Sequence, residues 1–131
     1  MTRNPLQITD FGVNDLPDQT GKTILITGAN NGLGLRAATT LAGAGARIIL
    51  ACRNQATGHE ALRRVGNAGP GIEHGLVALD LADLARVREA AAEATTLAPR
   101  IDVLINNAGL MAVPFARTVD GFEMQIGTNH F

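Results

Sequence analysis

Serine, tyrosine and tryptophan are all absent from this chain of 131 residues, and lysine occurs once, as Lys22. Chemistry that needs a seryl hydroxyl or a tyrosine phenol within hydrogen-bond reach of a substrate therefore has no residue to carry it here. The one cysteine, Cys52, cannot form an intramolecular disulfide, and it lies in an apolar run. This cysteine usage is typical of a protein kept in a reducing, intracellular setting.

The chain also lacks long apolar runs and a large excess of positive or negative charge. No apolar stretch approaches the ~20 residues that span a bilayer, and residues 1–10 are polar and lack a signal-peptide pattern. The net charge is −1, which favours neither nucleic acid nor an anionic membrane. His59, His74 and His130 are scattered without the paired spacing of a metal site. We predict a cytoplasmic protein with no metal, no nucleic-acid partner and no membrane association.

What the chain does contain is 46% hydrophobic and 18% charged residues, a composition typical of one globular domain. Short apolar runs typical of buried parallel strands occupy residues 23–27, 47–52, 75–79 and 101–105. Helical patterns lie between them: one ends at Gly43, one is capped by Asn54 and reaches about Val65, and one runs from Asp83 towards Pro99. A further helical pattern covers 121–131.

Alternation of strand and helix at this spacing builds right-handed βαβ units. The sequence therefore predicts an α/β fold, a Rossmann-type doubly wound parallel sheet truncated after about four strands. Residues 1–21 are predicted to form an irregular N-terminal arm, and residues 22–131 the nucleotide-binding domain.

The turn after the first strand, residues 27–34, reads Thr-Gly-Ala-Asn-Asn-Gly-Leu-Gly and leads into a helix. Glycine is needed where a strand turns tightly into a helix and where a dinucleotide diphosphate approaches the backbone N–H groups of the helix N-terminus. A plain tight turn is the alternative, but the position between a buried strand and an amphipathic helix favours nucleotide binding.

The end of the second strand bears on which nucleotide would bind. An NAD-binding Rossmann unit usually has an acid there for the ribose 2′-hydroxyl, whereas this chain has Arg53 and no acid within residues 50–54. A guanidinium could form paired hydrogen bonds with a 2′-phosphate. NADP is therefore favoured over NAD, with a solvated Arg53 that binds nothing as the alternative.

Three motifs stand in order along the chain: the glycine-rich turn at 27–34, Asp80-Leu81 after the third strand, and Asn106-Asn107-Ala108-Gly109 after the fourth. Together they closely resemble the short-chain dehydrogenase/reductase family. Residues 51–54 and 127–131 look most like its retinol-dehydrogenase-like branch. The resemblance covers residues 16–131 and implies hydride transfer between NADP(H) and a carbonyl or alcohol substrate.

The resemblance also implies roles for individual residues. Those that would contact the diphosphate and the adenosine ribose are Gly28, Asn30, Asn31, Gly32 and Leu33. Those that would line the adenine site are Asp80, which would accept a hydrogen bond from the exocyclic amine, and Leu81. Those that would pass beside the cofactor are Asn107, Ala108 and Gly109, with Asn107 also tying the central strands together. Asn129 would be the active-site asparagine that anchors a water in a proton relay. Asn31 stands where many members have serine, but an amide can also donate and accept.

The family mechanism that the resemblance implies uses a serine and a Tyr-x-x-x-Lys pair, and Lys22 precedes the first strand. We therefore interpret the chain as the cofactor-binding portion of a longer protein, inactive alone, with its fourth strand left as an exposed apolar edge. A non-catalytic dinucleotide-binding module and a non-functional truncated product are the alternatives. In this family later residues shape the substrate pocket and the subunit contacts. The identity of the substrate therefore cannot be predicted from these residues, and a homo-oligomer is expected only of a complete form.

Overall fold

The computed structural model describes residues 11–131, so the first ten residues of the predicted arm lie outside the described residues. The described part of the arm holds one short 3-10 turn, η1 (Val13–Asp15). Strands and helices then follow in the order β1 (Thr23–Thr27), α1 (Gly32–Gly43), β2 (Arg47–Cys52), α2 (Gln55–Ala68), β3 (Gly75–Ala78), α3 (Leu84–Leu97), β4 (Val103–Ile105) and α4 (Met124–Asn129).

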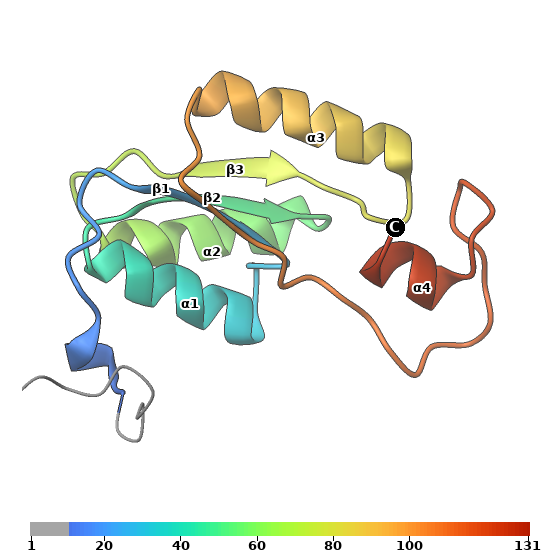
Figure 1. Ribbon diagram of the computed structural model, residues 1–131, viewed down its shortest axis with the longest axis horizontal. Helices are drawn as coiled ribbons and strands as arrows, with labels where there is room; N and C mark the ends of the chain where they lie inside the picture. The colour runs from blue at the N-terminus through green and yellow to red at the C-terminus, as the bar shows by residue number, and fades with distance from the viewer. Residues whose placement is uncertain (1–10) are drawn as a thin grey trace, which may run out of the picture.

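The four strands form one parallel sheet in the order β3-β2-β1-β4. Helices α1 and α2 cover one face of the sheet and α3 covers the other (Figure 1). Because the chain crosses from β3 over β2 and β1 to place β4 on the far side of β1, the carboxyl ends of β1 and β4 mark the point where the strand order reverses. This arrangement confirms the predicted doubly wound, Rossmann-type α/β fold, and it is at such a switch point that open α/β sheets bind ligands.

The core lies around β1 and β2, whose side chains alternate between the two faces. Ile24, Ile26, Ile48 and Leu50 are buried against α1 and α2, while Leu25, Ile49 and Ala51 are buried against α3. Both faces of the two central strands are thus covered, which explains why their sequences are continuously apolar rather than alternating.

Strand β4 is one of the two edge strands of this sheet among residues 11–131, the other being β3. Val103 is 40% exposed and Leu104 is 57% exposed, in contrast to the fully buried centre of β2. Beside it, an apolar groove of about 480 Å³ lies between the sheet and α3, lined by residues that include Leu25, Ala90 and Leu104. The predicted exposed apolar edge is therefore present.

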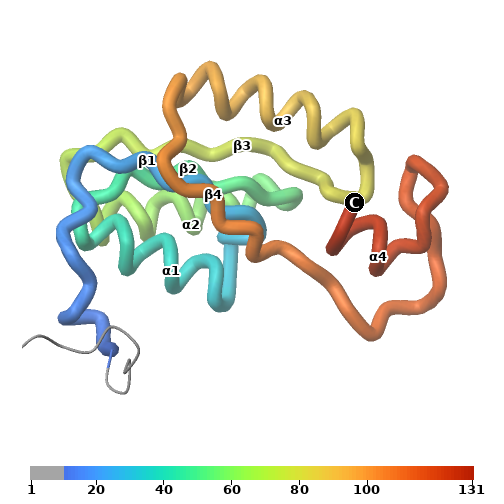
Figure 2. Tube along the Cα trace, in the orientation of Figure 1, coloured from blue at the N-terminus to red at the C-terminus, as the bar shows by residue number. Residues whose placement is uncertain are grey.

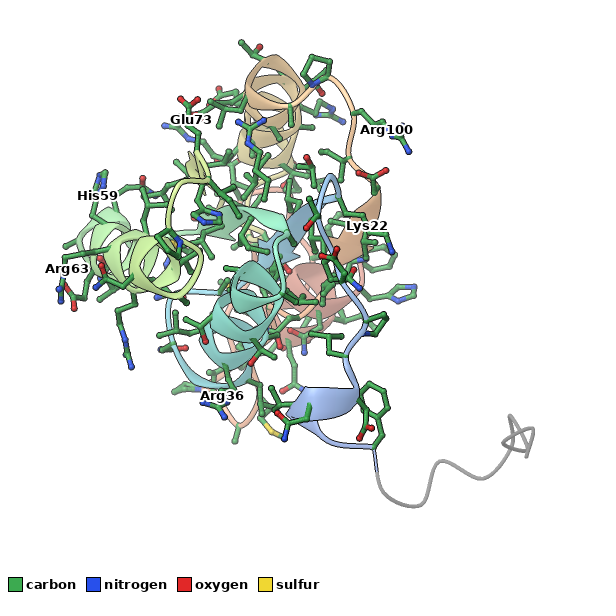
Figure 3. The ribbon with its side chains drawn as sticks, turned by 90° about the vertical axis from the view of Figure 1, so that its left-hand side faces the viewer. Lys22, Arg36, His59, Arg63, Glu73 and Arg100 are labelled. Atoms are coloured by element: carbon green, nitrogen blue, oxygen red, sulfur yellow. The ribbon has the colours of Figure 1, made fainter. Side chains whose placement is uncertain are left out.

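The helices follow the capping residues predicted from the sequence. The Asn54 side chain accepts a hydrogen bond from the Thr57 N–H at the start of α2, and the Asp83 side chain accepts one from the Ala85 N–H at the start of α3. On the outer faces of α1 and α2, Arg36 and Arg63 point away from the sheet (Figure 3). Each helix therefore presents its apolar face to the core and its charged face to solvent.

The last helix begins later than predicted. Residues 121–123 precede α4 instead of belonging to it, because Gly121 has a φ of +89° and closes a turn in which its N–H donates to Thr118 O. The helix starts only at Met124, where Glu123 caps it. Figure 2 shows the chain leaving β4, running past the carboxyl ends of the strands and returning to α4 on that side of the molecule.

Candidate dinucleotide-binding site

The glycine-rich turn lies at the carboxyl end of β1, and two of its glycines are required by close approach. Gly28 has a φ of +62°, and a Cβ there would lie 2.8 Å from the Cα of Ala108. Gly34 lies in the first turn of α1, where a Cβ would lie 2.5 Å from Nδ2 of Asn107. The turn is therefore packed directly against the segment that follows β4, as expected for a loop that lets a ligand reach the backbone.

The N-terminus of α1 has unused backbone donors. Asn31 is the N-cap residue, but its side chain makes no capping hydrogen bond. Leu35 N–H donates to Asn31 O at 3.1 Å, so the amides before Leu35 have no partner inside the helix. They border a cavity of about 310 Å³ lined by Gly28, residues 30–33 and residues 107–109. Free amides at a helix start, facing an open cavity, fit an anionic group such as a diphosphate.

Thr27 joins the ends of β1 and β4. Its hydroxyl oxygen accepts the N–H groups of both Asn107 and Ala108, each at 3.0 Å. Asn107 Nδ2 in turn donates to Thr27 O at 3.1 Å and to Gly28 O at 3.3 Å. These bonds fix the segment 107–109 beside the glycine-rich turn. Thr27 was not among the predicted site residues, although its place at the end of the first strand, before Gly28, was the available signal.

A second cavity, of about 260 Å³, lies at the carboxyl ends of β2 and β3. Its lining includes five residues predicted to contact the cofactor besides the glycine-rich turn: Arg53, Asp80, Leu81, Ala108 and Gly109. Asp80 Oδ1 accepts the Ala82 N–H at 2.9 Å, which orients the carboxylate and leaves Oδ2 available to accept from a ligand. Arg53 is exposed and forms no hydrogen bond or ion pair with any residue from 11 to 131.

Asn30 links the glycine-rich turn to the start of α2. Its Nδ2 donates to Thr57 Oγ1 at 2.9 Å, and the Thr57 hydroxyl donates to Asn54 O at 3.2 Å. The two loops that border the second cavity are thereby connected, one from β1 and one from β2. Neither Thr57 nor Asn54 was predicted as part of the site, because this contact joins residues 27 positions apart and leaves no local pattern.

Asn129, the predicted active-site asparagine, is the last residue of α4. Its Oδ1 accepts the Leu110 N–H at 2.8 Å and its Nδ2 donates to Leu110 O at 2.7 Å. Both polar atoms of the side chain are therefore used to attach α4 to the segment after β4. The backbone carbonyl of Asn129, at the helix end, has no later helical N–H to accept.

Cys52 also lines the second cavity, but it is only 4% exposed. Burial raises the pKa of its thiol. A thiol that is harder to ionise is a poor nucleophile, so Cys52 acts as a small core residue. Among residues 11–131, no three His, Cys, Asp or Glu side chains gather in a way that could hold a metal ion.

The two cavities share Gly28, Asn30, Ala108 and Gly109, so together they form one continuous surface along the carboxyl edge of the sheet. All predicted cofactor-binding residues line this surface. Leu110 also lines it, and Asn129 adjoins the surface because its side chain is hydrogen-bonded to Leu110. A model of the short chain dehydrogenase family matches residues 22–130. The chain belongs to this family.

Two similar proteins, one a curated relative and one a solved structure, illustrate how much of the chain such likenesses cover. Retinol dehydrogenase 14 of Mus musculus is 50% identical over 120 residues, covering 84% of this chain and 36% of that protein. This relative confirms the resemblance to the retinol-dehydrogenase-like branch. An uncharacterized protein of Mycobacterium Paratuberculosis has a crystal structure that superposes with a TM-score of 0.79 at 46% identity, over 93% of this chain and 42% of that one. The chain thus spans less than half the length of both.

Two further solved structures similar to this chain are cofactor complexes. The L-sorbose reductase of Gluconobacter frateurii, complexed with NADPH and L-sorbose, is 34% identical with a TM-score of 0.66, over 70% of this chain and 35% of that one. An NAD+-bound xylitol dehydrogenase is 30% identical with a TM-score of 0.67, over 79% of this chain and 38% of that one. The family therefore binds NAD(P). Within residues 11–131 no helix is both long enough and apolar enough to cross a bilayer.

Proposed function

We propose that this chain is the cofactor-binding portion of an NADP-dependent oxidoreductase that transfers hydride between NADP(H) and a carbonyl or alcohol substrate. The observation that carries the preference for NADP is Arg53, an exposed arginine with no partner among residues 11–131, at the edge of the second cavity.

The surroundings of Arg53 are suited to a phosphate. It follows β2 directly, at the point where an NAD-binding unit usually has an acid. It also precedes α2, whose first turn contains no acidic residue. A helix start carries partial positive charge, so the guanidinium and the helix end would attract the same 2′-phosphate, with no carboxylate nearby in sequence to repel it.

The other contacts follow from the geometry described above. Amides at the start of α1 would hold the diphosphate. The free Asp80 oxygen would accept from the adenine amine, and residues 107–109 would lie alongside the nicotinamide half. The nicotinamide, when bound, supplies or accepts the hydride. Since the Asn129 side chain is committed to Leu110, its backbone carbonyl is the group that would anchor a water.

Arg53→Ala tests the proposal through the binding of NADPH and NADH, measured by the nicotinamide fluorescence of each. The unmodified chain is expected to bind NADPH more tightly. Loss of hydrogen bonds to a charged phosphate should raise the Kd of NADPH about 10- to 100-fold in Arg53→Ala and leave that of NADH unchanged.

Arg63→Ala is the matched control, since Arg63 is an exposed arginine of α2 that pairs with Glu60. It should change neither Kd. Equal affinity of the unmodified chain for the two cofactors, or an equal loss of affinity for both in Arg53→Ala, would contradict the preference for NADP.

The predicted cytoplasmic location is a separate proposal, tested by fractionating cells that express the chain.

A further inference from the structure

Residues 116–131, here called the α4 segment, form a self-contained turn and helix. Thr118 is buried, and its N–H and hydroxyl oxygen form hydrogen bonds with the Phe122 backbone O and N–H, at 2.7 and 3.2 Å. Glu123 accepts the N–H groups of Gln125 and Ile126, one on each carboxylate oxygen, at 3.0 Å each. These bonds shape the segment internally but do not place it on the rest of the fold.

Two hydrogen bonds place it on the start of α3. Asp120 Oδ2 accepts the Leu84 N–H at 2.8 Å, and Val119 N–H donates to Ala82 O at 3.0 Å. Helix α3 therefore receives two carboxylates at its N-terminus: that of Asp83, its own N-cap residue, and that of Asp120, which lies 36 residues after Leu84 in the chain. A carboxylate at a helix start is favoured both by the free N–H groups and by the helix dipole.

This attachment point adjoins the cofactor surface. Ala82, whose carbonyl accepts from Val119, donates its own N–H to Asp80 Oδ1. At the other end of the α4 segment, Thr128 forms part of the wall of the cavity that Asp80 also lines, and Asn129 binds Leu110. The segment thus bridges from the adenine side of the cavity to the segment after β4.

We infer that Asp120 is a positioning residue: by capping α3 from a distance, it holds the α4 segment so that Thr128 closes the cofactor cavity and Asn129 stays paired with Leu110. The part of this inference that concerns cofactor affinity rests on the proposed function. The part that concerns the Asn129–Leu110 pair does not.

Asp120→Ala tests the inference, with Asp83→Ala as its matched control, because both variants remove one carboxylate cap from the same helix end. Asp83 makes its capping bond to Ala85 N–H within its own helix, whereas Asp120 reaches α3 from the α4 segment. Amide hydrogen exchange of Leu110, measured by NMR, reports the pairing with Asn129. The amides of the buried β2 residues Ile49 and Leu50 report whether the sheet remains folded.

Both variants should lower the Tm by similar amounts. Only Asp120→Ala should speed Leu110 exchange, by about tenfold, the factor that corresponds to the loss of one helix cap. The same variant should raise the Kd of NADPH. Asp120→Asn, which keeps an acceptor oxygen for the Leu84 N–H, should restore both values.

Equal acceleration of Leu110 exchange in Asp83→Ala and Asp120→Ala, or none in either, would overturn the inference, as would failure of Asp120→Asn to restore it. If Asp120→Ala also speeds exchange of the β2 amides, the test is made on the unmodified chain. There the Leu84 and Leu110 amides should be protected from hydrogen exchange to the same degree, and unrelated degrees of protection would refute the role of Asp120. If the unmodified chain binds no NADPH, the proposed function fails, while the exchange comparison still decides the role of Asp120.

Discussion

Two glycines of the same turn should respond differently to alanine. At Gly28 the backbone has a φ of +62° and a Cβ would lie 2.8 Å from the Ala108 Cα. Left-handed backbone costs a residue with a Cβ roughly 1–2 kcal/mol, and overpacking adds about 1–3 kcal/mol. Gly28→Ala should therefore lower the free energy of unfolding by about 2–5 kcal/mol, a large part of the ~5–15 kcal/mol typical of a domain.

At Gly32 the φ is +54°, but a Cβ would meet no atom within 4 Å. Only the backbone cost of roughly 1–2 kcal/mol applies there. The added methyl would instead project where the cavity beside α1 is open, in the place proposed for the diphosphate. Gly32→Ala should therefore damage NADPH binding far more than it damages stability.

Urea unfolding followed by far-UV circular dichroism measures the first effect, because the chain has no tryptophan or tyrosine for intrinsic fluorescence. With an m-value of about 2 kcal/mol/M, the midpoint should fall by about 1–2.5 M in Gly28→Ala and by about 0.5–1 M in Gly32→Ala. Titration with NADPH measures the second effect. The reasoning is refuted if Gly32→Ala is as unstable as Gly28→Ala, or if it binds NADPH as the unmodified chain does.

Two other expectations concern activity and pH. The purified 131-residue chain should bind NADPH but show no substrate-dependent turnover, since it contains neither serine nor tyrosine; steady oxidation of NADPH with any carbonyl substrate would contradict this. The Thr23 N–H, and then Arg100, lower the pKa of Asp102 in the folded chain. A carboxyl group whose pKa is lower in the folded than in the unfolded chain stabilises the fold at pH values above its unfolded pKa of about 3.9. This contribution is lost as the pH falls through the folded pKa. Asp102→Asn should therefore lose less stability than the unmodified chain between pH 5 and pH 3 in urea unfolding, and an identical loss would rule out this role.

Local chemistry made most of the sheet and its helices predictable. The apolar runs at β1 and β2 are buried on both faces, so their composition reflects their environment directly. Asn54 and Asp83 cap the helices predicted for them, because an N-cap bond spans only two or three residues. Element ends were less predictable: β4 begins at Val103, after Asp102 has turned to accept the Thr23 N–H from a strand 79 positions away.

The candidate site was likewise predictable only in part. The glycine-rich turn, Asp80 and the segment 107–109 could be located from motifs, since each follows a strand end at one edge of the sheet. The contacts that join these pieces could not. Thr27 to Asn107, Asn30 to Thr57 and Asp120 to Leu84 each pair residues at least 27 positions apart. Such side-chain bonds depend on the folded arrangement and not on any nearby pattern.

The unequal coverage of the sheet has a consequence for how the molecule opens. β2 lies between two strands and is sealed on both faces, whereas β4 pairs only with β1 and borders the apolar groove. Local openings involve the least buried elements first. The backbone amides of β4 should therefore exchange with deuterium before those of β2. Thr27 lies at the boundary between these regions, since its hydroxyl accepts the N–H groups of Asn107 and Ala108, which follow β4.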